Sequence, residues 1–461
     1  MAEHDAYQRA VCEATQFRLK DDVDYFLETF KEDKESVILL PGGGGSNLWH
    51  ADKKFDQVSD PRNYVFDLIW LDLGIAFGDA KAIKISRNGR DVGERVIVGD
   101  GDVSFFRARP YIKAMNFFRR QANFNAVLIG FDWRRNLFHS VDTLRDVIME
   151  IKQTKPPKVM KKLFVVGHSL GGLVAKLFFQ THQDLAREIG GMISVGTPFY
   201  GYLGQLRRIF EGEPQINRFY NARTVATISS SWPGLYTVLP IDKRTYDDVG
   251  GQIGLDAYPV TALDGTPADA YDENAPSSRF PNWVWIKQID EGRKVRKLLS
   301  KELPDSLKSA VFHIRSKISD STPWIAEWNQ ELPPNYDPDK HPSPIKIGRM
   351  GEGDGTIPYW SAALASADGD NVKDFSQGEH MALMAQSFVL RHILKIVSRD
   401  TRSVAESDVI AEYGPDPQMA TREELDILIS QIDWSAPGVI GQLDTLIPER
   451  YAWRFLQEIA M

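Results

Sequence analysis

The sequence of 461 residues predicts an α/β protein built on a mostly parallel, doubly wound sheet. Short apolar segments typical of buried strands alternate with segments of helical periodicity up to residue 198. This alternation then stops, and a strand-like pattern returns near residue 345, which indicates a large insertion. The successive predicted strands start at Val37, Val127, Leu163 and Met192.

These changes of pattern divide the chain into four parts. Residues 1–35 form a polar lead-in with a short amphipathic helix, and residues 36–198 together with 345–398 form the α/β core. Residues 199–344 form a cap or lid that is inserted into this core. Residues 399–461 form a helical extension, which we expect to pack against the main body.

The composition indicates a globular protein and excludes several functional classes. Hydrophobic residues make up 43% of the chain, which argues against general disorder. The net charge is −8 and long basic runs are absent from the sequence, so we expect no nucleic-acid partner. The single cysteine, Cys12, excludes an intrachain disulfide and a cysteine-rich zinc site, and we expect neither a metal nor a cofactor.

The first residues and the hydropathy predict a cytoplasmic location. The N-terminus has neither a basic start nor an apolar core of the kind found in signal peptides. The apolar runs of the sequence are also shorter than the roughly 18 residues that a membrane-spanning helix needs. The oligomeric state is left open by the sequence.

A glycine-rich loop follows the first predicted strand, Ser36 to Leu40. Residues 41–46 read Pro-Gly-Gly-Gly-Gly-Ser, and glycines at this place let backbone N–H groups point into open space, as an oxyanion hole requires. A flexible turn or an anion-binding nest are the alternatives. Residues 49–109 then resemble an irregular insertion with strand-like pieces at 82–85 and 95–98.

The next strands lead to a serine that is bracketed by glycines. A helix is predicted over 111–121 and a strand over 125–130. After a further helix, the apolar strand 163–166 meets residues 167–171, Gly-His-Ser-Leu-Gly, and an apolar helix follows. A serine on so tight a strand-to-helix turn is a nucleophile elbow, with its hydroxyl lifted above the sheet. We therefore take Ser169 as the candidate nucleophile.

The cap contains many aromatic residues. Long helices and proline-rich turns accompany its tryptophans, and residues 311–315 resemble one more strand of the main sheet. A cap of this kind can shape an acyl or alcohol pocket, whereas the alternative is that the tryptophans simply extend the hydrophobic core. The tryptophans of the cap are Trp232, Trp283, Trp285, Trp324 and Trp328.

Candidates for an acid and a base follow the cap. Residues 345–350 resemble a late strand, and Asp354 stands between glycines directly after it, where its carboxylate can reach sideways to a histidine. His380 lies in a loop ahead of a helix, while His392 lies inside that helix, so we take His380 as the base. His168 leaves the elbow in another direction than Ser169 and is not expected to be the base.

The chain order of serine, aspartate and histidine is that of the α/β-hydrolase fold. His380 would accept the proton of the Ser169 hydroxyl while Asp354 holds the imidazole in one tautomer. The oxyanion of the tetrahedral intermediate would receive backbone N–H bonds from Leu170, the residue after the nucleophile, and from the glycine loop, where Gly43 is the candidate donor.

Several motifs make the chain resemble the lecithin:cholesterol acyltransferase-like family of α/β-hydrolases over residues 36–395. This family includes phospholipases A, transacylases and phospholipid:diacylglycerol acyltransferases. The resemblance rests on Leu40-Pro-Gly-Gly, Phe131-Asp-Trp-Arg, Gly167-His-Ser-Leu-Gly, Gly196-Thr-Pro, Ser231-Trp-Pro-Gly-Leu-Tyr ahead of Leu239-Pro, and Gly353-Asp-Gly-Thr.

The resemblance implies a triad of Ser169, Asp354 and His380, with oxyanion positions at Gly43 and Leu170. Two features of the sequence depart from the family pattern. The single cysteine does not allow the disulfide-closed lid of the secreted animal members, and Phe131 replaces the usual tyrosine. The chain thus resembles a bacterial-type, cytoplasmic member, and the family's acyl acceptor and lipid substrate do not carry over.

Together these observations predict a serine hydrolase that cleaves or transfers the acyl group of a lipid-like ester, as a phospholipase A, lipase or O-acyltransferase does. The aromatic cap could make peripheral contact with a membrane. A small-ester or lactone hydrolase is the alternative among enzymes. A catalytically silent hydrolase-fold interaction protein is the alternative from another class, and the intact triad and glycine loop argue against it.

Overall fold

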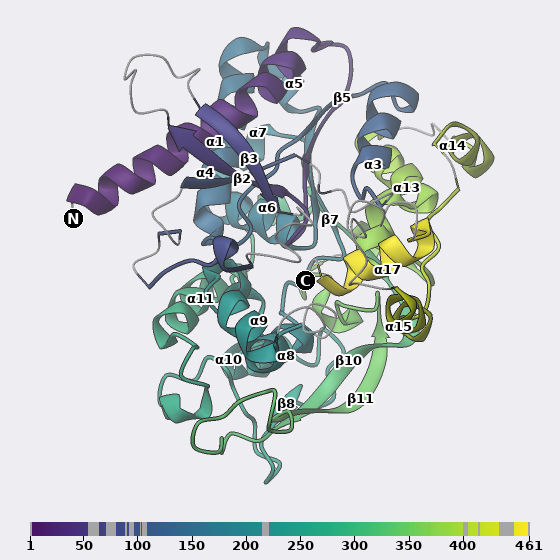
Figure 1. Cartoon of the computed structure of the whole chain (residues 1–461). Coiled ribbons are helices and arrows are strands. Elements are labelled where there is room, and N and C mark those ends of the chain that lie inside the picture. The colour runs from purple at the N-terminus through teal and green to yellow at the C-terminus, as the bar shows by residue number, and fades with distance from the viewer. Residues whose placement is uncertain are drawn as a thin grey trace.

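The computed structural model describes most of the chain (Figure 1). The described residues are 2–53, 64–70, 80–87, 90–91, 96–101, 103, 108–213, 221–367, 369–399, 404–413, 415–432 and 447–459. A parallel sheet with helices on both faces forms the centre, and two smaller sheets lie outside it. This arrangement confirms the predicted α/β-hydrolase fold class.

Six strands of the described chain form the central sheet in the order β12-β9-β7-β6-β1-β5. Each neighbouring pair is parallel. The strands predicted to start at Val37, Val127, Leu163 and Met192, and the one predicted at 311–315, all lie in this sheet. The strand bounds are β1 Ser36–Leu40, β5 Asn125–Leu128, β6 Leu163–His168, β7 Gly191–Val195, β9 Val311–Ser316 and β12 Val372–Phe375.

Alternate side chains of the central strands supply two separate hydrophobic clusters. Ile38 and Val165 pack on one face with helices α4 (Leu137–Thr154) and α6 (Leu170–Thr181). Val37 and Val166 pack on the other face with α13 (Ser387–Ser398) and residues of α3 (Ile112–Asn116). Because successive side chains of a strand point to opposite faces, continuous apolar runs are needed to cover both.

The N-terminal helix is longer than the sequence pattern predicts. Helix α1 spans Ala2–Glu28, whereas a short helix was expected near residues 23–30. Its buried apolar side chains are spaced at three to five residues, with charged residues among them; they are Tyr7, Val11, Ala14, Leu19, Val23 and Phe26. The apolar stripe is therefore too thin to stand out as helical periodicity.

The segment between the glycine loop and residue 109 contains a small antiparallel sheet in the order β3-β2-β4. Its strands are β2 Asn47–Lys53, β3 Tyr64–Trp70 and β4 Val96–Asp100. Residues 96–98 of the strand-like piece predicted at 95–98 lie in β4, and residue 95 lies outside the described residues. The strand prediction at 82–85 is wrong. Residues Ala80–Ile83 form a 3-10 turn, η2, and Ile85 makes only an isolated bridge with Asp91.

The strand predicted at 345–350 exists but lies in another sheet. It is part of β11 (Ile345–Gly353), which pairs antiparallel with β10 (Ile318–Trp328) in an outer sheet completed by β8 (Val260–Thr261). Several of its side chains are exposed, and a strand with one solvated face suits an antiparallel sheet better than a buried parallel one.

Residues 199–344, predicted as a cap, combine helices and 3-10 turns with the strands β8, β9 and β10. Trp232, Trp283 and Trp328 are buried and Trp324 is partly buried, so these rings extend the core. The helical elements are α8 Leu203–Glu211, α9 Ala222–Ser229, η6 Pro233–Val238, α10 Lys243–Val249, η7 Ser277–Arg279, α11 Ile286–Leu299 and α12 Asp305–Lys308.

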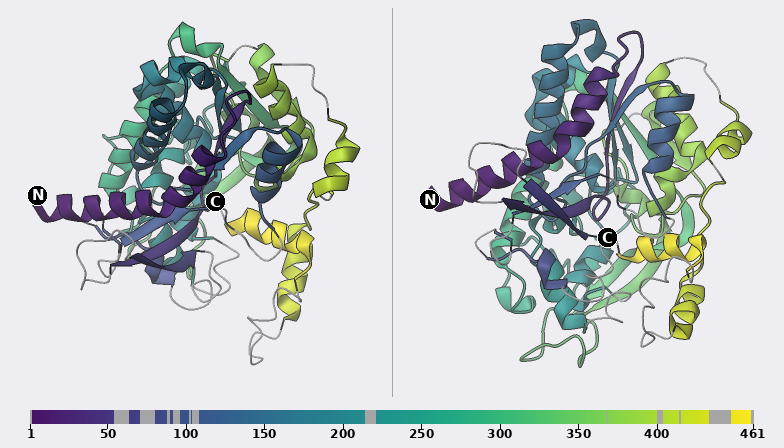
Figure 2. Two further views of the ribbon diagram at one scale, coloured as in Figure 1. Left: turned by 90° about the horizontal axis from the view of Figure 1, so that it is seen from above. Right: turned by 45° about the horizontal axis from the view of Figure 1, so that its top comes forward.

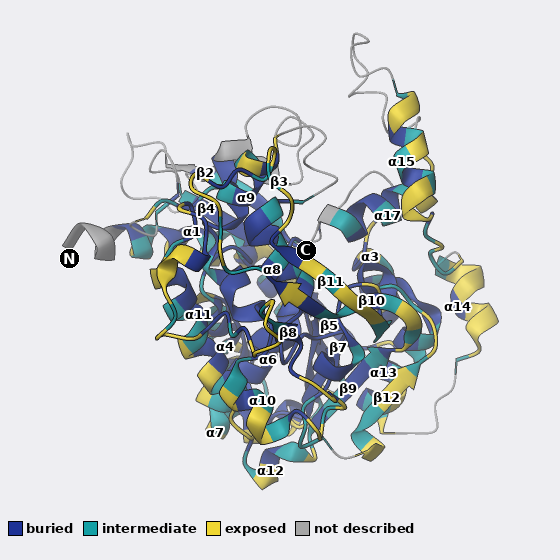
Figure 3. Ribbon diagram, turned by 90° about the horizontal axis from the view of Figure 1, so that it is seen from below, coloured by how far each residue is buried: buried dark blue, intermediate teal, exposed yellow. Residues whose placement is uncertain are grey.

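The C-terminal helices form an arm along one side of the molecule. They are α14 Glu406–Tyr413, α15 Arg422–Gln431 and α17 Glu449–Ile459. Figure 3 shows exposed faces on α14 and α15, whereas α6 in the centre is almost wholly buried. In Figure 2 helix α17 runs from this arm toward the middle of the molecule. No helix in the described part of the chain is long and apolar enough to cross a membrane.

Candidate active site

Ser169 stands on the sharp turn between β6 and α6. Its backbone has φ 51° and ψ −120°, a conformation that residues other than glycine rarely adopt. A Cβ on Gly171 would lie 2.5 Å from the carbonyl oxygens of Leu40 and Pro41, and one on Gly167 would lie 2.5 Å from the Gly172 nitrogen. Only glycine fits at these two places, so the strained turn depends on both.

Asp354 and His380 form a buried hydrogen-bonded pair. Nδ1 of His380 lies 2.6 Å from Oδ2 of Asp354, and the backbone N–H of His380 donates to the Asp354 carbonyl at 2.9 Å. The other carboxylate oxygen, Oδ1, accepts from the backbone N–H groups of Thr356 at 3.0 Å and Ile357 at 2.6 Å. Both oxygens are therefore engaged, which fixes the carboxylate in one orientation.

The pair leaves one nitrogen of the imidazole ring for another partner. Because an ionised carboxylate only accepts hydrogen bonds, Nδ1 of His380 carries the proton and Nε2 keeps its lone pair. His380 is fully buried, and its Nε2 has no hydrogen-bond partner among the described residues. A buried imidazole in this state can accept a proton.

The pair lies at the same edge of the sheet as the serine. The N–H of Ser169 donates to the Val195 carbonyl at the end of β7, and Gly196 follows. A Cβ on Gly196 would lie 2.9 Å from Oδ2 of Asp354 and 3.1 Å from Nδ1 of His380. The carboxyl ends of the neighbouring strands β6 and β7 thus bring the predicted serine, acid and base together.

His168 links the base to the glycine loop. Its Nε2–H donates to the carbonyl of His380 at 3.0 Å, so its Nδ1 accepts from the hydroxyl of Tyr111 at 2.8 Å. The same hydroxyl accepts the N–H of Gly42 at 2.7 Å. Burial, and then the nearby His380, keep the pKa of His168 well below its ordinary value. The neutral His168 ring thus links the backbone of His380 to Tyr111 and, through the Tyr111 hydroxyl, to the glycine loop.

The expected oxyanion donors lie on either side of Ser169. Leu170 is the first residue of α6, and the first N–H groups of a helix have no partner within it. In the glycine loop the Gly42 N–H donates to Tyr111 and the Gly45 N–H donates to the Gly42 carbonyl. Gly43 between them is half-exposed, and a Cβ on Gly42 would lie 3.0 Å from that of Ser169. Gly43 stays the predicted loop donor.

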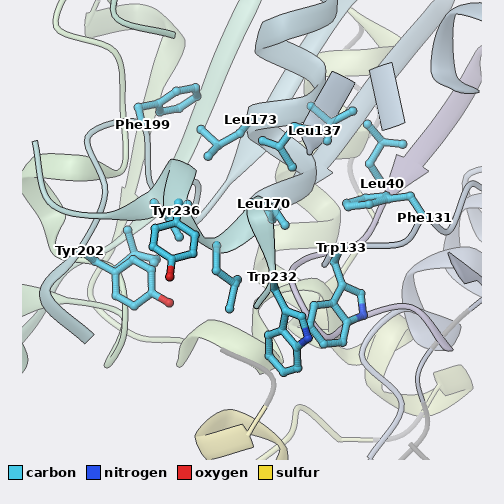
Figure 4. Packing of buried hydrophobic residues seen from close by; sticks show 14 of the residues in the cluster. Leu40, Phe131, Trp133, Leu137, Leu170, Leu173, Phe199, Tyr202, Trp232 and Tyr236 are labelled. Atoms are coloured by element: carbon cyan, nitrogen blue, oxygen red, sulfur yellow. The ribbon is translucent and has the colours of Figure 1, made fainter. Parts of the chain in front are cut away.

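The Phe-Asp-Trp-Arg segment is held by buried ion pairs. Arg134 is fully buried and pairs with Asp132 at 2.6 Å and Asp91 at 3.0 Å. Burial alone would raise the pKa of the Asp132 carboxyl, but the Arg134 and Arg135 guanidinium groups outweigh it and lower that pKa. The neighbouring Trp133 meets the ring of Trp232 edge to face at 4.9 Å (Figure 4).

His392 lies outside this arrangement. It is on α13, half-buried, and its ring meets that of Phe375 at 6.0 Å. Burial lowers the pKa of His392 to about 4, with smaller effects from Lys373 and Lys395. In the described part of the chain, no group of three or more histidine, cysteine or acidic side chains could hold a metal ion.

Residues 111–278 match the protein-family model described as lecithin:cholesterol acyltransferase. The predicted family resemblance is confirmed over these residues. The matched stretch contains the elbow with Ser169 but neither Asp354 nor His380, so the lecithin:cholesterol acyltransferase match supports the serine more directly than its partners.

Two further comparisons describe more distant similarity. An uncharacterized protein of Saccharomyces cerevisiae, YJR098C, is 26% identical over 241 residues, which is 52% of this chain and 34% of the yeast protein. The chain thus spans about a third of the length of that curated relative. A chain in the crystal structure of the Tle4–Tli4 complex aligns with a TM-score of 0.51 at 14% identity, over 79% of this chain and 98% of that chain. At this identity the match supports the fold alone.

A carboxylesterase structure from the ammonia-oxidizing thaumarchaeon Nitrososphaera gargenis also aligns. It is 12% identical over 81% of this chain and 94% of that chain, with a TM-score of 0.26. A TM-score this low carries no argument about fold or function.

Tyr111 and Gln457 are residues of this region that the sequence did not single out. Tyr111 starts a helix among apolar residues and shows no pattern of its own. Gln457 lies in the C-terminal helix next to the buried Leu456, and a polar side chain on a buried helix face is a signal that could have found it.

Replacing Tyr111 by phenylalanine is expected to destabilise the protein. The change removes the hydroxyl that accepts from Gly42 and donates to His168, and both partners are buried. Because each unsatisfied buried group costs about 1–3 kcal/mol, we expect the free energy of unfolding to fall by about 2 kcal/mol or more in urea titrations. Tyr25→Phe is the control, since Tyr25 is 55% exposed; an equal loss in both variants would contradict the role of the network.

Proposed function

We propose that the chain is a serine hydrolase or acyltransferase that acts on the acyl group of an ester through Ser169, His380 and Asp354. The observation that carries this proposal is the buried Asp354–His380 pair at 2.6 Å, at the sheet edge where Ser169 holds its strained turn. The family match over residues 111–278 supports acyl-ester chemistry.

The proposed reaction proceeds through an acyl-enzyme. Nε2 of His380 accepts the proton of the Ser169 hydroxyl as Oγ attacks the ester carbonyl, and the N–H groups of Leu170 and Gly43 receive the oxyanion. The intermediate collapses when the ester C–O bond breaks and His380 returns the proton to the leaving alkoxide. Water or an acceptor alcohol then attacks the acyl-enzyme by the same route, and Ser169 regains its proton.

The apolar surroundings of the elbow favour a lipid-like substrate. Leu170, Phe199, Tyr236 and the Trp133–Trp232 pair belong to one buried cluster around the start of α6 (Figure 4). Apolar surroundings of this kind favour an acyl chain over a polar substituent. In this proposal the enzyme is cytoplasmic and touches its lipid through the cap, on which Leu263 and Ile286 are exposed apolar residues.

The substrate class is tested by acyl-product analysis. Purified protein would be incubated with phospholipids, acylglycerols and short p-nitrophenyl esters, each with and without an added alcohol. We expect release of fatty acid or acyl-alcohol from at least one long-chain lipid, and faster turnover of long-chain than of short-chain esters. Turnover confined to short esters or lactones would instead support a small-ester hydrolase.

A further inference from the structure

The C-terminal helix α17 joins the two turns that carry the acid and the base. Oε1 of Gln457 accepts the backbone N–H of Met381 at 2.8 Å, and Nε2 of Gln457 donates to Oγ1 of Thr356 at 2.8 Å. Met381 follows His380, and Thr356 stands two residues after Asp354. One buried side-chain amide thus bridges the turn of the acid and the turn of the base.

The bridged turns determine where the carboxylate and the imidazole lie. The backbone N–H of Thr356 donates to Oδ1 of Asp354, so a shift of this turn moves the carboxylate. The backbone of His380 is bonded to the Asp354 carbonyl, so a shift of Met381 moves the ring. The Gln457 amide fixes the spacing of the two turns through bonds that are independent of the carboxylate–imidazole contact itself.

A second side chain of α17 forms an ion pair at the turn that carries His380. Arg454 lies three residues before Gln457, hence on the same helix face, and its NH2 pairs with the Glu379 carboxylate at 2.7 Å. Glu379 directly precedes His380. Nε of Arg454 donates to the Ala420 carbonyl at 2.6 Å, which ties this contact to the segment that leads into α15.

Helix α17 is held in place by its apolar side. Ala452, Trp453, Phe455 and Leu456 are buried, and α17 lies against the turn η10 (His380–Ala385). In Figures 1 and 2 the helix reaches from the outer arm to the centre of the molecule. Because Gln457 is anchored on a packed helix, its side-chain amide holds the two turns at a fixed spacing.

We propose that Gln457 is a positioning residue for the acid–base pair, and that the C-terminal segment 447–459 completes the active site of the hydrolase core. This inference rests on the proposed function. Gln457 touches neither Ser169 nor the reacting atoms in this scheme. It acts by holding Asp354 and His380 in the orientation that proton transfer requires.

The test compares two glutamine-to-methionine changes of similar volume. Gln457→Met removes both bridging bonds. Gln386→Met instead removes the bond from Gln386 Nε2 to the Pro417 carbonyl, which ties the residue after η10 to the C-terminal segment without joining the turn of Asp354 to that of His380. Gln386 is also buried, at 7% exposure. A fluorophosphonate probe measures the reactivity of Ser169 without a known substrate.

We expect Gln457→Met to lower the maximal labelling rate of Ser169 by about 10–100-fold, because misplacing reacting groups by about 1 Å costs up to that factor. The half-saturating probe concentration should stay unchanged, since no group that touches the probe is altered. Gln386→Met should label at the wild-type rate, although both variants lower the melting temperature. Equal labelling by Gln457→Met and wild type would overturn the inference.

A double-mutant cycle with Thr356→Val separates positioning from general stability. The valine keeps the shape of the side chain but removes the hydroxyl that accepts from Gln457. If the two residues act through one bond, the labelling rate of the double variant should be higher than the product of the single effects predicts. If Gln457→Met does not fold, Thr356→Val alone decides: a slowed rate supports the inference and a wild-type rate overturns it. A wild-type protein that is not labelled at all would instead contradict the proposed function.

Discussion

Replacing Ser169 by alanine is expected to abolish acyl transfer from esters and labelling by a fluorophosphonate. Removing the nucleophile of a serine triad lowers kcat by about 10⁶-fold, because the remaining histidine and aspartate cannot form the acyl-enzyme. Alanine keeps the Cβ at a position where the backbone already has φ 51°, so the fold should be unaffected. Mass spectrometry of the labelled wild-type protein should place the adduct on Ser169.

Ser194→Ala is the matched control for this change. Ser194 is a buried serine on the adjacent strand β7, and its Oγ lies 2.7 Å from Nδ1 of His313. It has no glycine-bracketed turn, however, and sits within a regular strand. We expect Ser194→Ala to keep its labelling. A loss of labelling in Ser194→Ala but not in Ser169→Ala would contradict the assignment of the nucleophile.

The sequence could predict the inner strands of the central sheet because they are buried on both faces, whereas the partly exposed edge strand β12 was not predicted. Val37 to Leu40 and Leu163 to Val166 are continuous apolar runs. Strands of this kind that are separated by helices are typical of a parallel sheet covered on both faces. The strand at 345–350 shows the limit of this reasoning. Its pattern predicts a strand but not its partner, since pairing with β10 depends on contacts that a single segment does not encode.

The pairing of Asp354 with His380 could also be predicted, because chain order and loop placement restrict the candidates to few residues. The bonds that support the pair could not. Tyr111 and Gln457 act through single hydrogen bonds to backbone groups, a histidine and a threonine, and such bonds leave no periodic signal in the sequence. Their partners are also 57 to 101 residues away along the chain.

For the C-terminal helices too, the sequence predicts local structure but not long-range contacts. The capping box of Thr421 and Glu424 is visible in the sequence and is present at the start of α15. The sequence could therefore place the helices along the chain, but it could not show which part of the molecule they contact. That α17 contacts the turns of Asp354 and His380 follows from packing of its apolar side, which the sequence shows only as a pattern of spacing.

Replacing His380 by alanine is expected to lower activity about as much as the loss of the nucleophile, roughly 10⁶-fold in kcat, since the Ser169 hydroxyl then has no base within the site. His392→Ala should keep most of the activity. His392 packs against Phe375 on α13 and is not bonded to Asp354, so its loss removes a ring contact rather than a proton acceptor.

The two variants together decide which histidine is the base. Labelling rates and ester turnover would be measured for both, with urea unfolding to exclude loss of the fold. Retained labelling in His380→Ala combined with loss in His392→Ala would overturn the assignment. The geometry favours the opposite result, because only one oxygen of Asp354 remains after its backbone bonds to Thr356 and Ile357, and Nδ1 of His380 already lies 2.6 Å from it. A second histidine could replace His380 only if the turn that begins at His380 moved away from the acid.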